Sequence, residues 1–260
     1  MPVGGMIAGL LIPFLIITVN WQTALYVIAA LSFFFAAVMQ PFRTEFDSDR
    51  NPGASTSLRG LLRNVQVFHS RPLCTLGLTS LAFIGIQMAF ATFFVSFLVK
   101  GLGHDIETAG LIFSAGQISA VGFRILWGWI SDRFLPARRV LSILGFCTAA
   151  SACAVASFTP DMPIWMLVAI NIVFTSTAYS WNGVLWAEVA RNAPPGRVGA
   201  LTGPVVSFAY VGSTLFPGLS AALLAATDSF AVLFVVSAAP ALVMATVLLF
   251  RPWASGQGRV

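Results

Sequence analysis

The sequence predicts an all-α membrane protein, a polytopic bundle of about eight transmembrane helices. Of its 260 residues, 58% are apolar and only 9% are charged, whereas soluble domains carry about 25% charged residues. The apolar residues form separate runs, several of them close to the roughly 20 residues that a helix needs to cross a bilayer. A soluble core could not bury this much apolar surface, so the expected partner of the chain is the lipid bilayer.

Polar or Pro/Gly-rich breaks separate the runs and define the expected spans. These cover residues 4–19, 22–42, 73–99, 107–130, 139–158, 163–189, 197–224 and 228–250. The first run is the shortest of them. The breaks at 20–21 and 159–161 are very short, which predicts antiparallel neighbours on either side of each.

The basic residues predict how the spans are oriented. Twelve of the fourteen Lys and Arg residues lie on one side of the spans, and that side should face the cytoplasm. An even number of spans places both termini there too, in a multi-pass protein of the bacterial inner membrane. Because these cations sit in short loops and not on a polar domain, nucleic acid is not an expected partner.

The long polar stretch at 43–72 is the expected cytoplasmic linker. Its second half carries apolar residues on one helical face, at Leu58, Leu61, Leu62, Val65 and Phe68. This pattern favours a short amphipathic helix in the membrane interface. A partner-binding motif is the alternative.

A shift of 208 residues aligns the second span with the eighth. Residues 25–28, Leu-Tyr-Val-Ile, fall on residues 233–236, Leu-Phe-Val-Val. The first and seventh spans then also correspond, and both carry glycines four residues apart, at Gly5 and Gly9 and at Gly199 and Gly203. Such spacing allows close helix packing in lipid.

Parallel six-helix repeats are a known transporter design. On this interpretation the chain starts at the fifth of twelve helices. Residues 1–42 are the last two helices of an N-terminal bundle, 73–252 form a six-helix C-terminal bundle, and 253–260 are a cytoplasmic tail.

The segment after the fourth span holds the most informative motif. It contains Gly128, then Asp132-Arg133, then the basic pair Arg138-Arg139. This order resembles the cytoplasmic loop signature of the major facilitator superfamily, which occurs between helices two and three and again between eight and nine. The position between helices eight and nine agrees with the repeat, because the fourth span of this chain is then the eighth of twelve helices. The departures are residues 135–137, Leu-Pro-Ala, where a Gly usually stands, and a longer gap to the basic pair.

The resemblance implies a secondary transporter in which two helix bundles rock around a central site, here apparently lacking its first four helices. It also implies a cytoplasmic gate. Glu188 ends the sixth span on the same side as the motif, so a pair between Glu188 and Arg133, with Arg191 nearby, should tie helix ends together. Ordinary boundary charges are the alternative, and exposed ion pairs contribute little stability.

Arg124 is the one ionisable residue well inside a span. A buried Arg costs on the order of 3 kcal/mol, so the side chain should face the bundle interior. Two interpretations stay open. Arg124 either reaches the cytoplasm or pairs with Asp132 or Glu188, or it binds an anionic substrate, as the resemblance to the monocarboxylate-carrier branch implies. A guanidinium suits a carboxylate because it donates two parallel hydrogen bonds.

Other polar residues inside the spans are candidate substrate ligands, with hydrogen bonds between helices as the alternative. They are Gln87, Gln117, Asn171, Thr175, Asn182 and Tyr210. The spacing of Asn171, Thr175 and Asn182 predicts one continuous helical face.

Enzyme chemistry is not expected, because the common catalytic and phosphate-binding motifs are absent from the sequence. The three cysteines lack metal-ligand spacing, so neither a metal nor a cofactor is predicted. The expected function is secondary transport of a small organic solute, with an organic anion favoured. The alternative is a truncated, non-transporting form or a membrane scaffold subunit that needs the missing helices or a partner chain.

Overall fold

The computed structural model describes residues 2–43, 70–193 and 198–250, and every regular element in these ranges is a helix. The predicted interfacial helix and the tail at 253–260 lie outside the described residues. The helices are α1 (Pro2–Thr18), α2 (Trp21–Met39), α5 (Arg71–Ser96), α6 (Ile106–Arg133), α7 (Ala137–Ala156), α8 (Ile164–Ala178), α9 (Trp181–Arg191), α10 (Val198–Thr227) and α11 (Phe230–Phe250). A 3-10 turn at Gln40–Phe42 extends α2, and a π-helical turn at Phe97–Gly101 extends α5.

Seven of the described helical segments are long and apolar enough to cross a membrane, with α8 and α9 together forming one of them. The first predicted span, 4–19, corresponds to α1, which contributes the shorter apolar helix Ile7–Thr18. The polytopic helical bundle predicted from the sequence is confirmed.

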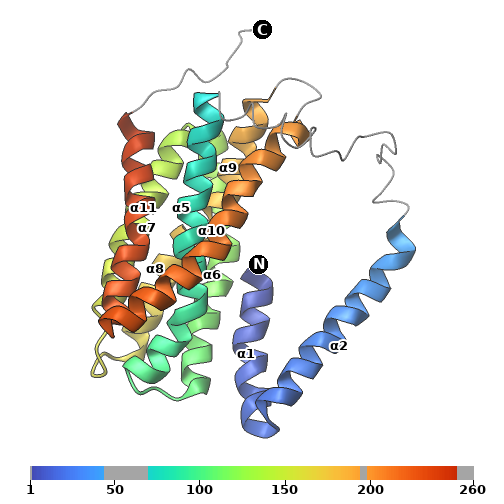
Figure 1. The fold of residues 1–260 in the computed structure, drawn as a ribbon, viewed down its shortest axis with the longest axis vertical. Helices are drawn as coiled ribbons and strands as arrows, with labels where there is room; N and C mark the ends of the chain where they lie inside the picture. The colour runs from blue at the N-terminus through green and yellow to red at the C-terminus, as the bar shows by residue number, and fades with distance from the viewer. Residues whose placement is uncertain (1, 44–69, 194–197, 251–260) are drawn as a thin grey trace.

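Helices α5 to α11 form one bundle in which α7 packs against α11, α5 against α10, and α6 against α8 (Figure 1). Phenylalanines fill one part of its core, where the ring of Phe90 stacks on Phe94 and Phe174 with centroids 4.2 Å apart. A second part of the core surrounds Trp181, whose ring stacks on Phe83 at 5.8 Å. Buried aromatic contacts of this kind fix how the helices pack.

Helix α1 packs on α6 through small residues. A Cβ added at Gly110 would lie 2.7 Å from Pro13 Cγ, and a Cβ at Gly9 would overlap the Ser114 hydroxyl. Glycine therefore allows the two backbones to approach closely here. In contrast, α2 packs mainly on α1 and lies apart from the bundle in Figure 1.

The 208-residue repeat also appears in the helix boundaries. That shift moves the end of α1 to residue 226 and the start of α2 to residue 229, each within one residue of the end of α10 and the start of α11. The turns are capped alike, since Asn20 accepts from the Thr23 N–H at 2.7 Å and Ser229 Oγ from the Val232 N–H at 3.3 Å.

The predicted basic loops meet at one end of the bundle. Arg71 starts α5, Arg133 ends α6, Arg138 lies in the first turn of α7 and Arg191 ends α9. In Figure 1 this is the upper end, where α5 begins and α9 ends. The alternation of basic loops therefore has a structural counterpart in the antiparallel order of the helices.

Candidate functional site

The sixth predicted span is broken in its middle. Helix α8 ends at Ala178 and α9 begins at Trp181, so Tyr179 and Ser180 lie between two helices. The continuous face predicted for Asn171, Thr175 and Asn182 is therefore wrong, because Asn182 belongs to the second helix.

Hydroxyl groups explain why the helix ends here. The side chains of Thr175, Ser176 and Thr177 donate to main-chain carbonyls three or four residues earlier, at 2.8 to 3.0 Å in their shortest bonds. Such bonds compete with the regular helix ladder and bend helices. The Ser180 N–H then donates to the Thr177 carbonyl at 3.4 Å, which tightens the last turn.

The Arg124 side chain reaches this break. Its Nη2 donates to the main-chain carbonyl of Tyr179 at 3.0 Å, while its buried Nε has no hydrogen-bond partner. Asp132 and Glu188 both pair with Arg191, so the predicted pairing of Arg124 with either of them is wrong in this structure. Within the described ranges, then, the guanidinium is held by a carbonyl and makes no ion pair.

Gln87 of α5 approaches the same break from another helix. Its side-chain Oε1 accepts from Trp181 Nε1 at 3.2 Å, and its main-chain carbonyl accepts from the Tyr179 hydroxyl at 3.4 Å. Gln117 of α6 is also buried, lies against the Tyr179 side chain, and has an Nε2 without a partner. Three helices thus bring polar groups to one point inside the bundle.

Asn171 and Thr175 join α8 to α6. The Asn171 Nδ2 donates to the Ile112 carbonyl at 2.6 Å, and the Thr175 hydroxyl lies 3.2 Å from that of Ser119. Both residues are fully buried. These bonds agree with the alternative to a substrate-binding role, which is hydrogen bonding between helices.

The last two candidate ligands lie elsewhere. Asn182 is partly exposed in the first turn of α9, and Tyr210 is 70% exposed on α10. The sequence did not distinguish these exposed positions from the buried ones, because all six lie in segments apolar enough to cross a membrane.

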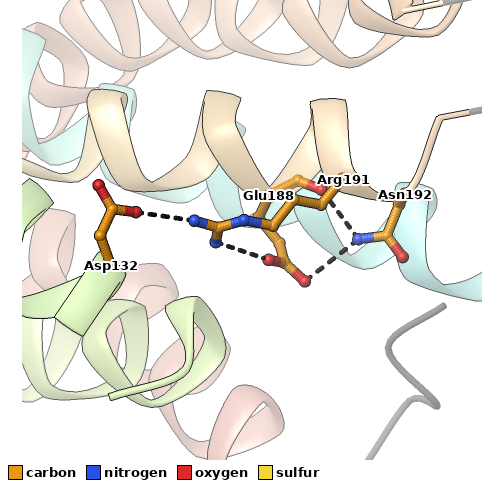
Figure 2. Close-up of polar contacts among 4 residues, drawn as sticks. All are labelled: Asp132, Glu188, Arg191 and Asn192. Atoms are coloured by element: carbon orange, nitrogen blue, oxygen red, sulfur yellow. Dashed lines mark hydrogen bonds and ion pairs between the residues drawn. The ribbon is translucent and has the colours of Figure 1, made fainter. Parts of the chain in front are cut away.

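A second polar cluster ties α9 to α6 at the basic end of the bundle. Arg191 Nη2 lies 2.8 Å from Asp132 Oδ1, and its Nη1 lies 3.4 Å from Glu188 Oε2 (Figure 2). Asn192, which the sequence did not indicate, donates to Glu188 Oε1 at 3.1 Å. The predicted pair of Glu188 with Arg133 is wrong, because Arg191 lies three residues after Glu188 on the same helix and takes its place.

The remaining residues of the Gly128 to Arg139 motif take no part in this cluster. Arg133 and Arg139 are exposed, and the buried Nη1 of Arg138 has no hydrogen-bond partner. A Cβ added at Gly128 would meet nothing within 4 Å, so no neighbouring helix approaches this glycine closely in the described part of the chain. Nor do the described residues include a group of three or more His, Cys, Asp or Glu that could hold a metal.

Comparison with known proteins decides the family. The model of the Major Facilitator Superfamily matches residues 1–213. The chain belongs to this superfamily. The assignment predicted from the Gly128 to Arg139 segment is therefore confirmed, and the chain is a multi-pass membrane protein of a family that transports small solutes across membranes.

Curated relatives of this superfamily chain include the probable nitrate/nitrite transporter NarK2 from two strains of Mycobacterium tuberculosis. Each is 31% identical over 132 residues, a match that covers 51% of this chain and 32% of the relative. The chain thus aligns with about a third of the length of the curated relatives. A transporter family is not a class of enzymes, which agrees with the absence of catalytic motifs from the sequence.

Proposed function

We propose that this chain is the anion-binding part of a secondary transporter that moves a small anion by alternating access. The observation that carries the proposal is Arg124. Its guanidinium lies inside a span, has a buried Nε without a partner, and makes no ion pair with any described carboxylate.

An unpaired cation inside a bundle is costly, and a bound anion would offset that cost. A guanidinium donates from a planar fork, which suits an anion with two coplanar oxygens. Carboxylate, nitrate and nitrite all meet this requirement. Because the NarK2 relatives are described as probable nitrate/nitrite transporters, nitrate and nitrite are the first candidates, and organic carboxylates are the second.

The cluster of Asp132, Glu188 and Arg191 is proposed as the cytoplasmic gate. It joins α6, which carries Arg124, to α9, which begins at the break. On this proposal the basic end faces the cytoplasm of a bacterial inner membrane, both termini lie there, and the cluster is intact while the carrier opens to the outside.

The proposed function is tested by uptake of isotopically labelled nitrate. The chain is produced alone in bacterial cells that lack nitrate uptake, with Arg124→Lys as the matched variant and acetate as competitor. Saturable uptake that Arg124→Lys abolishes supports the proposal, and competition by acetate extends it to carboxylates.

Two results would contradict it. Full uptake by Arg124→Lys removes the ligand role. Inserted chain that shows neither nitrate uptake nor nitrate binding after purification removes the anion-binding role. Nitrate binding without uptake keeps that role and favours a binding subunit that needs further helices or a partner.

A further inference from the structure

We propose that Gln87 is a positioning residue for Arg124, acting through the break between α8 and α9. This inference rests on the proposed function, because it assigns a role to Gln87 in anion binding by Arg124. Gln87 is not itself a ligand on this proposal, since its Oε1 is already the acceptor of the Trp181 Nε1–H.

The first step is the bond between Arg124 and the break. The N–H donors of a guanidinium lie in one plane, so a single bond from Nη2 to the Tyr179 carbonyl limits how that plane can turn. The bond leaves Nε without a protein partner. The carbonyl therefore orients the group and still leaves a donor for an anion.

The second step is that the break itself needs to be held. Tyr179 and Ser180 are outside both helices, so no regular helix ladder fixes the Tyr179 carbonyl. Gln87 bonds to one residue of the break and to the first residue of α9. Its main-chain carbonyl accepts from the Tyr179 hydroxyl at 3.4 Å, and its Oε1 accepts from Trp181 Nε1 at 3.2 Å. One residue of α5 thus holds both the start of the break and the helix that follows it.

The third step is burial. Gln87 is 1% exposed, Tyr179 is 3% exposed and Trp181 is fully buried against Phe83. Loss of the Gln87 acceptor would leave the buried Trp181 N–H unpaired. An unpaired buried donor costs more free energy than a typical hydrogen bond contributes to stability. The break is therefore expected to relax when the Gln87–Trp181 bond is removed, and Arg124 is expected to lose its preorganised orientation.

The test measures nitrate binding to the purified chain in phospholipid nanodiscs by isothermal titration. Gln87→Met removes the acceptor at nearly the same volume, and Trp181→Phe removes the donor but keeps a ring on Phe83. Each variant is expected to raise the nitrate Kd by about tenfold with unchanged stoichiometry. The double variant should raise it no further, because both changes remove one bond.

Controls separate positioning from structure. Ser151→Ala removes a buried hydroxyl that bonds only to carbonyls of its own helix α7, and it should leave Kd unchanged. A residue with a purely structural role would lower the fraction of binding-competent protein and leave its Kd intact. In an Arg124→Lys background, Gln87→Met should have no further effect on Kd.

The outcomes distinguish the two proposals. Wild-type protein that binds neither nitrate nor acetate, or Arg124→Lys that binds as wild type does, overturns the proposed function. If Arg124→Lys weakens binding while Trp181→Phe and Gln87→Met both keep the wild-type Kd, Gln87 has no positioning role. Should Gln87→Met not fold, the conservative Trp181→Phe variant alone decides between these results.

Discussion

Replacing Gly116 with Ala tests how tightly α8 is held on α6. A Cβ at Gly116 would lie 2.5 Å from Asn171 Nδ2 and 2.9 Å from Cγ, closer than real Cβ contacts. Asn171 can escape only by giving up its 2.6 Å bond to the Ile112 carbonyl. We therefore expect Gly116→Ala to destabilise the bundle at this joint.

The magnitude follows from two opposing terms. Losing a buried hydrogen bond costs about 1–3 kcal/mol, and replacing a helical Gly with Ala gains about 0.4–1 kcal/mol. Subtracting the midpoints of these two ranges leaves a net loss of about 1–2 kcal/mol. At about 2–4 °C per kcal/mol for a chain of this size, the thermal midpoint should fall by roughly 2–8 °C.

The assay is thermal unfolding of the purified protein in detergent, with Gly122→Ala as the control. Gly122 lies on the same helix, and a Cβ there meets nothing within 4 Å, so that variant should melt at or above the wild-type temperature. Asn171→Ala should remove the clash, so the double variant with Gly116→Ala is expected to be less destabilised than the sum of the two single variants. Equal midpoints for Gly116→Ala and Gly122→Ala would refute the reasoning.

Three further predictions concern the proposed gate, an exposed helix cap and the aromatic core. Asp132→Asn should raise the accessibility to thiol reagents of Cys74, which lies near the start of α5 at the basic end of the bundle. Stability should change by at most about 1 kcal/mol, because exposed ion pairs are weak, and unchanged labelling would remove the proposed gating role. The Thr108 main-chain N–H and hydroxyl lower the pKa of Asp105, the N-cap of α6. Since the folded pKa is below the unfolded one, this stabilisation is present above the ordinary value of 3.8 and is lost as the pH falls through the folded pKa. Melting curves of Asp105→Ala between neutral and acidic pH should therefore lack that part of the acid sensitivity, and an unchanged profile would contradict it. Phe90→Ala, which removes two stacked contacts at 4.2 Å, should cost about 3–5 kcal/mol, and a midpoint close to wild type would show that the cluster is not tightly packed.

Much of the fold could be predicted because bilayer thickness and loop charge constrain a sequence strongly. Apolar run lengths gave the spans, and the Gly128 to Arg139 segment gave the superfamily. The repeat between residues 25–28 and 233–236 anticipated the matching helix ends. The run lengths and the motif are local in sequence, and the repeat is a comparison of the sequence with itself, so all three can be recognised without knowledge of packing.

The candidate site was harder to predict because its contacts join helices far apart in the sequence. Nothing in the run around Gln87 indicates that it bonds Trp181, and a spacing rule that assumes an unbroken helix fails at Tyr179. The three consecutive hydroxyl residues from Thr175 onward were the available signal for the break. In the proposed gate, the i, i+3 spacing of Glu188 and Arg191 favours that ion pair. The predicted pairing of Glu188 with Arg133 did not take this spacing into account.

The packing of α1 on α6 has a consequence for biosynthesis. Gly9 and Gly110 touch across the two helices but are separated by 101 positions in the chain. At roughly 5–20 residues per second, a ribosome needs on the order of 5–20 s to make the surface that receives α1. During that interval α1 cannot yet make its contact with α6. The contact between the glycine face of α1 and α6 therefore forms late in synthesis, after α5 and α6 have entered the membrane.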